Sequence, residues 1–133
     1  MELRPIATVS SPLTEPAAAP KQGDEGAPDA WIEFEPEFAD ALDGIGAGER
    51  LIVVTWLDRA QRDVLRVHPR GDTTRPERGV FGTRSPHRPN PLGLHEVVVL
   101  EIEGTRMLVR DLEALDGTPV VDVKSVLREI GER

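Results

Sequence analysis

The sequence contains no cysteine, which excludes a disulfide scaffold, a thiolate metal site and a cysteine nucleophile. Its first residues, MELRPIATVSS, lack the apolar segment of a signal peptide, and no apolar run approaches the length of a membrane span. We therefore expect a soluble, cytoplasmic protein. A length of 133 residues fits a single domain, residues 1–133, with one modest hydrophobic core.

Several catalytic signatures are also absent. No Walker A pattern occurs, and GIGAG over residues 44–48 follows a predicted helix rather than a strand, so a flexible helix exit explains it better than a dinucleotide loop. His68, His87 and His95 lack the spacing of a zinc site, and we expect no metal. Ser85 lies near His87 without a nucleophile elbow or a third partner, which disfavours a serine hydrolase.

The hydrophobic pattern predicts a mostly-β fold. Apolar or alternating runs indicate about seven short strands, at Pro5–Val9, Trp31–Phe34, Arg50–Leu57, Asp63–Pro69, Leu94–Gly104, Thr105–Leu115 and Pro119–Val126. The pair Gly104–Thr105 suits a type II′ hairpin turn. One short helix is predicted over residues 36–46, with Pro36 in its first turn. Residues 10–30, rich in proline, alanine and glycine, predict a loop.

These elements favour an all-β barrel or sandwich with one short helix. The strands do not alternate with full-length helices, so a Rossmann-type fold with a doubly wound parallel sheet is not expected.

The net charge of −8 disfavours a generic nucleic-acid binder, because phosphate contacts require clustered lysine and arginine. The charge is unevenly distributed, however. Residues 1–60 carry a net charge of −8 and residues 101–133 a net charge of −3. Residues 61–100 carry seven arginines and four acidic residues, a net charge of +3, together with all three histidines. A single surface arginine commonly serves solubility, but this cluster favours an anionic ligand.

The basic segment contains an unusual loop, GVFGTRSPHRPNPLGLHEV, over residues 79–97. Pro86, Pro89 and Pro91 each fix a φ angle and restrict the residue before them. The polar side chains between them are therefore held in predetermined directions. Such preorganisation lowers the entropy lost when a ligand binds.

The polar residues of this loop favour a ligand site over a rigid corner whose polar groups only satisfy one another. Arg84 and Arg88 offer planar donor groups suited to a carboxylate or phosphate. Asn90 can both donate and accept, which suits a nucleobase edge or an amine. A second loop, LDGTPVVD over residues 115–122, has the signal of an ordinary turn, yet Asp116 in it suits a ribose hydroxyl or an ammonium group.

At these two loops the sequence resembles the TrmO/TsaA-like (YaeB-like) family. GVFGTRSPHRPNPLGL and LDGTPVVDVK are similar to its paired signatures, and PIATVSSP and LIVVTWLDRA extend the match over nearly the whole chain, loosely over residues 10–48. The resemblance implies a small β-barrel that binds S-adenosylmethionine without a Rossmann fold. It also implies a homodimer with the cofactor near the subunit interface, and methylation at N6 of threonylcarbamoyladenosine at tRNA position 37.

The resemblance also implies site residues. The implied cofactor-binding residues are Lys21, Gln22, Asp58, Arg59, Arg84, Leu94, Asp116, Gly117, Thr118 and Pro119. It assigns Asn90 to catalysis, as a group that orients the reacting amine. Arg75, Arg78 and Arg88 are assigned to the tRNA phosphates or the threonyl carboxylate. Because the methyl group is already activated on sulfur, alignment of the acceptor nitrogen can supply much of the rate.

The chain departs from the family pattern where the family often reads DIKPY. Here residues 122–126 read DVKSV, and tyrosine is absent from the whole sequence. Two alternatives therefore stay open beside the tRNA methyltransferase. One is a methyltransferase acting on another small substrate, and the other is a non-catalytic cofactor-binding barrel that serves as a sensor or adaptor. Only the first hypothesis predicts dependence on threonylcarbamoylated tRNA.

Overall fold

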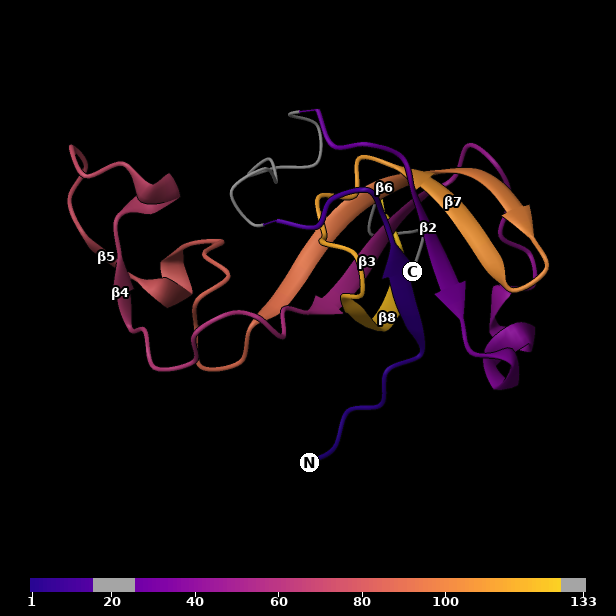
Figure 1. Cartoon of the computed structure of the whole chain (residues 1–133), viewed down its shortest axis with the longest axis horizontal. Coiled ribbons are helices and arrows are strands. Elements are labelled where there is room, and N and C mark those ends of the chain that lie inside the picture. Colours follow the sequence, from indigo (N-terminus) through magenta and orange to yellow (C-terminus); the bar gives the residue numbers. More distant parts are fainter. Residues whose placement is uncertain (16–25, 128–133) are drawn as a thin grey trace.

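Six antiparallel strands close into a barrel within residues 1–15 and 26–127, the part of the chain that the computed structural model describes. The strands are β1 (Ala7–Ser10), β2 (Ala30–Phe34), β3 (Arg50–Trp56), β6 (Leu92–Glu103), β7 (Arg106–Arg110) and β8 (Pro119–Ser125). Around the barrel they follow the order β1-β2-β7-β6-β3-β8 (Figure 1). The structure confirms the all-β barrel expected from the sequence.

Strand β3 shows how the sequence produces the barrel. Leu51, Val53 and Thr55 are buried and alternate with less buried residues, as the two faces of a strand require. One edge of β3 pairs with β6 from Arg50↔Val98 to Trp56↔Leu92, and the other edge pairs with β8. A strand with two paired edges is a central strand, as its continuous apolar run predicted.

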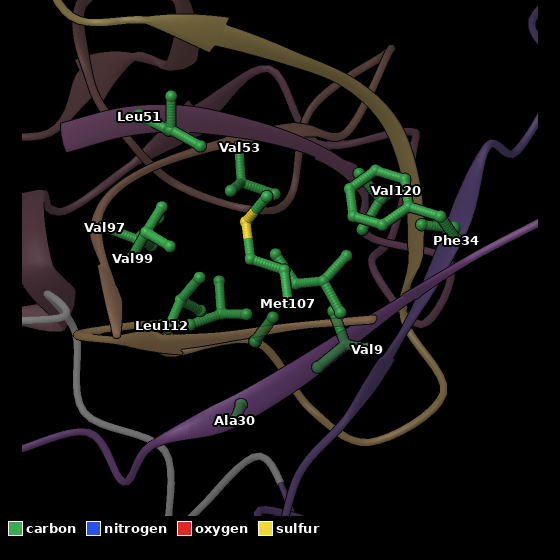
Figure 2. Close-up of a cluster of buried hydrophobic side chains, with 14 residues drawn as sticks. Val9, Ala30, Phe34, Leu51, Val53, Val97, Val99, Met107, Leu112 and Val120 are labelled. Atoms are coloured by element: carbon green, nitrogen blue, oxygen red, sulfur yellow. The ribbon is translucent and has the colours of Figure 1, made fainter. Parts of the chain in front are cut away.

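The hydrophobic core fills the barrel interior. Side chains from all six strands point toward one another in Figure 2, with the thioether of Met107 near the centre. Met107, Ile32 and Val53 are fully buried, and Leu112, just beyond β7, closes the cluster. An unbranched thioether suits such a position because it adapts to the irregular space between branched side chains.

The predicted short helix is a 3₁₀ helix, η3 (Pro36–Leu42), with Pro36 in its first turn as expected. Gly44 follows its end with φ of +86°, a conformation that glycine adopts without steric cost. The predicted hairpin turn is also present. Gly104 has φ of +63°, as the first central residue of a type II′ turn requires, and the turn joins the paired residues Glu103 and Arg106.

Two strand predictions were wrong in extent. Of the strand expected over residues 63–69, only β4 (Arg66–Val67) forms, and it pairs with β5 (Arg78–Gly79) outside the barrel. Pro69 lacks a backbone N–H group and ends β4. The strand expected over residues 105–115 ends at Arg110, because Asp111 adopts φ of +73°.

The β4–β5 pair is the centre of an arm, residues 61–90, that projects away from the barrel (Figure 1). The arm also contains two single-turn 3₁₀ helices that the sequence did not predict, η4 (Pro69–Gly71) and η5 (Val80–Gly82). Val80 is the only buried apolar residue of the arm.

No helix among the described residues is both long and apolar enough to cross a membrane.

The antiparallel order gives the barrel two different ends. At one end β1, β3 and β7 finish and β2, β6 and β8 begin, so the connections 11–29, 57–91 and 111–118 all lie there. We call this the site end. The opposite end carries η3 and the tight turn at Gly104. Residues 16–25 of the predicted 10–30 loop lie outside the described residues, while Ser10 belongs to β1 and Ala30 to β2.

Candidate functional site

The topology brings the predicted site residues to one end of the barrel. All of them that the structure describes lie in the connections of the site end, apart from Leu94 near the start of β6 and Pro119 at the start of β8. Lys21 and Gln22 lie outside the described residues. Three segments far apart in the sequence therefore meet because the strands that precede or follow them are neighbours in the sheet.

The acidic turn at Asp116 is anchored on the segment that follows β1. The backbone N–H of Asp116 donates to the carbonyl of Leu13 at 2.7 Å, and that of Gly117 donates to Val9 at 2.8 Å. The Asp116 side chain accepts a hydrogen bond from the Ser11 N–H at 3.0 Å. Gly117 has φ of +82°, as the Asp-Gly turn signal predicted. The turn is thus held on the barrel rim with its carboxylate exposed to solvent.

Thr118 is buried and closes this turn, because its hydroxyl donates to the Leu115 carbonyl at 2.7 Å. Replacing Thr118 with valine removes the donor but keeps the shape of the side chain. We expect the free energy of unfolding to fall by about 1 kcal/mol, the net contribution of one hydrogen bond, because the Leu115 carbonyl still accepts from the Thr118 backbone N–H at 3.1 Å. Urea denaturation measures the change, with Thr118→Ser as the control that keeps the hydroxyl. An equal loss in both variants would contradict this account.

A second set of contacts attaches the proline-rich loop to the segment that follows β3. The Leu57 N–H donates to the Pro91 carbonyl at 2.8 Å, and the Arg88 N–H donates to Gln61 at 3.1 Å. The Gln61 N–H donates in return to Nδ1 of His87 at 3.0 Å. These bonds hold the loop against the segment after β3, in addition to the restraint that its three prolines impose.

Asp58 and Arg59 lie between the two sets of contacts. Nη1 of Arg59 donates to the carbonyl of Thr14 at 3.1 Å, which connects the end of β3 to the segment after β1. Asp58 is exposed, and its carboxylate has no hydrogen bond or ion pair with the part of the chain that the structure describes. This carboxylate is therefore available to a ligand.

Arg62 is a site residue that the sequence reasoning missed. Its Nε donates to the Pro89 carbonyl at 2.7 Å, and its Nη2 donates to Oδ1 of Asn90 at 3.0 Å. Its guanidinium also lies over the Trp56 ring, 5.1 Å from the centroid. Arg62 therefore fixes the side chain of Asn90 and leaves the amide NH₂ group of Asn90 as a donor. The composition of the basic segment drew attention to its arginines but gave Arg62 no role.

The predicted arginines differ in their surroundings. Arg88 donates from Nη1 to the carbonyls of Thr83 and Ser85, both at 3.1 Å, so its guanidinium braces the loop from within. Arg84 and Arg78 are exposed and have no hydrogen bond or ion pair with any described residue. Arg84 is thus the arginine of this loop whose planar donors are available.

Arg75 pairs with Asp72 on the arm, with 3.5 Å between Nε and Oδ2. The pKa of Asp72 is held below its ordinary range, first by the hydrogen bond from the Thr74 hydroxyl, then by the Thr74 N–H, with Arg75 contributing further. A depressed pKa in the folded state stabilises the fold above the ordinary aspartate pKa, and this contribution disappears as the pH falls through the lowered value.

We expect Thr74→Val to move the Asp72 titration toward the ordinary aspartate range. The substitution removes the hydroxyl that is the largest cause of the lowered pKa. Carboxyl carbon NMR titration of wild type and variant measures both midpoints, with Thr73→Val as the neighbouring control. Coincident midpoints in wild type and Thr74→Val would contradict the assignment.

A buried polar chain lies beneath the site end, and the sequence gave no sign of it. The Oγ1 of Thr55 is 2.6 Å from Nε2 of His95, and Nδ1 of His95 is 2.6 Å from Oε1 of Glu113. Thr55 is fully buried, His95 is 5% exposed and the Glu113 side chain is 17% exposed. His95 is thus an interior residue rather than a surface one. Among the described residues, no group of three or more histidines and carboxylates is arranged to hold a metal.

The chain matches the family described as the tRNA-methyltransferase O N-terminal domain over residues 8–131. A protein of Archaeoglobus fulgidus named S-adenosyl-L-methionine-binding protein is 48% identical over 130 residues, which cover 98% of this chain and 92% of that protein. A probable S-adenosyl-L-methionine-binding protein of Methanothermobacter thermautotrophicus is 45% identical, with coverage of 98% and 93%.

The fold is similar to the crystal structure of TrmO from Pseudomonas aeruginosa. The two structures align with a TM-score of 0.76 and 27% sequence identity, over 96% of this chain but only 56% of the TrmO chain. The alignment therefore covers little more than half of that enzyme. The family match over residues 8–131, together with relatives more than 40% identical, shows that this chain belongs to the TrmO N-terminal domain family.

Proposed function

We propose that this protein is an S-adenosylmethionine-dependent methyltransferase that acts at N6 of threonylcarbamoyladenosine at tRNA position 37. One observation carries the proposal: the topology gathers both loops of the family signature, and the end of β3, at a single end of the barrel. Membership of the TrmO family and the names of the two archaeal relatives support the cofactor and the reaction class.

The residues at the site end fit the chemistry of S-adenosylmethionine. The cofactor carries a carboxylate, an ammonium group, a positively charged sulfur and an adenosine. Arg84 offers an unpaired planar donor for the carboxylate, while Asp58 and Asp116 offer exposed carboxylates for the cationic groups or ribose hydroxyls. Leu94, 49% exposed, offers an apolar surface for the adenine. Arg59, Gly117 and Thr118 position these groups through the contacts described above, and Pro119 begins β8 directly after them.

The cofactor, when bound, supplies a methyl group activated by the positive charge on sulfur. The protein must hold the acceptor nitrogen in line with that methyl group and exclude water. Asn90 is suited to orient the base, because Arg62 fixes its Oδ1 and leaves the amide NH₂ group to donate to an acceptor atom beside the reacting nitrogen. The proton that N6 loses on methylation passes to an acceptor at the site end, where the carboxylates of Asp58 and Asp116 are exposed. No side chain is required as a covalent nucleophile.

The arm supplies the positive charge that RNA recognition requires. Residues 61–90 carry seven arginines and three acidic residues, a net charge of +4 in a chain whose total is −8. We assign Arg75 and Arg78 to phosphates or to the threonyl carboxylate, and Arg88 to the conformation of the loop that meets the substrate. A base exposed in a single-stranded anticodon loop suits such a surface.

We further propose that the protein acts as a homodimer. Four large apolar side chains are exposed on the arm and at the start of β6: Leu65, Phe81, Leu92 and Leu94. Phe81 is 81% exposed. A second chain would cover this surface and shield the cofactor site from water. Light scattering coupled to size exclusion tests this proposal, and a monomer at micromolar concentration would contradict it.

Methyl transfer from labelled cofactor to tRNA tests the proposed activity. We expect label to appear in threonylcarbamoylated tRNA and not in the same tRNA without that modification. Nucleoside mass spectrometry then locates the methyl group. Cofactor binding without transfer to any tRNA would instead favour a non-catalytic barrel that serves as a sensor or adaptor.

A further inference from the structure

The chain Thr55–His95–Glu113 connects three elements, and each of them carries part of the proposed cofactor site. Thr55 lies on β3 three residues before Asp58, and Glu113 lies three residues before Asp116. His95 follows Leu94 on β6 and bonds both partners at 2.6 Å. The hydrogen bonds therefore join the end of β3 and the start of β6 to the segment that leads into the acidic turn.

We propose that His95 is a positioning residue, which fixes the Asp116 turn relative to the start of β6 and the end of β3. The inference rests on the proposed cofactor site at this end of the barrel, and it adds a residue that lies outside the two quoted family signatures. His95 touches no ligand in this scheme. It acts through Glu113 on one side and Thr55 on the other.

The hydrogen-bond inventory selects one form of the His95 ring. Glu113 as a carboxylate can only accept, so Nδ1 of His95 must donate to it. A neutral ring then leaves Nε2 as an acceptor for the Thr55 hydroxyl, and every member of the chain is satisfied. A doubly protonated ring would donate to Thr55 as well. The Thr55 hydroxyl hydrogen, fully buried, would then have no acceptor among the described residues. The structure thus favours the neutral ring with the proton on Nδ1.

This arrangement of hydroxyl, imidazole and carboxylate is not a nucleophilic triad. Thr55 is fully buried and faces the barrel interior, so no substrate reaches its hydroxyl. Methyl transfer also requires no acyl intermediate. The hydrogen-bonded series Thr55–His95–Glu113 is therefore better suited to holding β3, β6 and the segment before the acidic turn together than to activating a nucleophile.

The segment that Glu113 belongs to has few other attachments before the acidic turn. Leu112 and Ala114 are buried on either side of Glu113, and Asp111 before them adopts φ of +73°, which costs energy for a residue other than glycine. Among the described residues, the Glu113–His95 bond is the one hydrogen bond made by a side chain of residues 111–115 itself; the Leu115 carbonyl accepts from the Thr118 hydroxyl. Loss of the Glu113–His95 bond should make the Asp116 turn more mobile while the barrel stays folded.

Three variants, one control variant and three measurements test the inference. Glu113→Ala and Thr55→Val each break one link, and Glu113→Gln keeps an acceptor for Nδ1. Leu51→Val, at the opposite end of β3, is the control for general destabilisation. Calorimetry measures the dissociation constant for S-adenosylmethionine. Amide hydrogen exchange measures protection of Asp116 and Gly117, whose N–H groups donate to Leu13 and Val9.

We expect Glu113→Ala to raise the dissociation constant about tenfold and to speed exchange at both amides about tenfold, as the loss of one buried charge-assisted hydrogen bond predicts. Glu113→Gln should retain most of the wild-type behaviour, and Leu51→Val should change neither quantity by more than about twofold. Nitrogen NMR of His95 should show a neutral ring protonated at Nδ1.

Exchange and affinity changes in Glu113→Ala no larger than those in Leu51→Val would overturn the inference, as would a ring protonated at Nε2. Absence of cofactor binding by the folded wild-type protein is a different result. It would refute the proposed function, and the exchange rates and the ring tautomer would still decide whether His95 holds the turn.

Discussion

Replacing Gly93 with alanine is expected to lower the free energy of unfolding by about 3 kcal/mol, through overpacking and the loss of a buried hydrogen bond. A Cβ atom at Gly93 would lie 2.5 Å from Oγ1 of Thr55 and 2.7 Å from Nε2 of His95. Those two atoms are themselves 2.6 Å apart. The backbone cannot easily move away, because Gly93 pairs with Thr55 in the β3–β6 ladder.

Urea denaturation followed by tryptophan fluorescence measures this loss. Gly79→Ala is the matched control, since the nearest atom to its added Cβ would be the Leu65 carbonyl oxygen at 4.0 Å and its φ is −63°. We expect that control to change stability by about 0.5 kcal/mol or less, or to raise it slightly. A decrease in the free energy of unfolding of less than about 1 kcal/mol for Gly93→Ala would contradict this expectation. It would show that the Thr55 and His95 side chains move apart at little energetic cost.

Replacing Arg62 with alanine is expected to lower the rate of methyl transfer about 100-fold, the scale of effect that misplacement of a reacting group by about 1 Å produces. Arg62 holds the Pro89 carbonyl and the Asn90 side chain, and it lies over Trp56. Its removal frees the Asn90 side chain from the direction that the proposed function requires of it. Because Arg62 is exposed, the free energy of unfolding should change by no more than about 1 kcal/mol.

Arg66→Ala provides the control for Arg62→Ala. Arg66 also lies on the arm, and its side chain bonds Glu77 at 2.9 Å, but that side chain bonds neither Pro89 nor Asn90. Single-turnover rates on threonylcarbamoylated tRNA compare the two variants. Equal rates in both would mean that Arg62 contributes charge rather than geometry.

Much of the barrel could be predicted from the sequence because its strands have strong local patterns. The alternation in Trp31–Phe34, the apolar run at Arg50–Leu57 and the Gly104 turn each specify an element without reference to the rest of the chain. The arm could not be predicted in this way. Its two strands are two residues long, and a pairing so short leaves no periodic signal.

The candidate site likewise has parts with a local sequence pattern, which could be predicted, and parts without one, which could not. The proline-rich loop and the Asp116 turn are contiguous motifs, so sequence alone identified them. The partners of His95 are 40 and 18 residues away from it, and Arg62 contacts residues 27 and 28 positions later. For His95 and Thr55, the strand register shows this proximity. Once β3 and β6 are paired with Thr55 opposite Gly93, the inward-facing His95 two residues later becomes a neighbour of Thr55.

A cofactor site at the site end of the barrel is tested by calorimetric titration with S-adenosylmethionine of three proteins: wild type, Arg84→Ala and Arg50→Ala. Arg84 is exposed at the site end, whereas Arg50 is exposed at the opposite end and pairs with Glu96. We expect binding by wild type and Arg50→Ala, and loss of binding in Arg84→Ala with unchanged thermal stability. Equal binding by all three proteins, or none by folded wild type, would contradict a cofactor site at this end of the barrel.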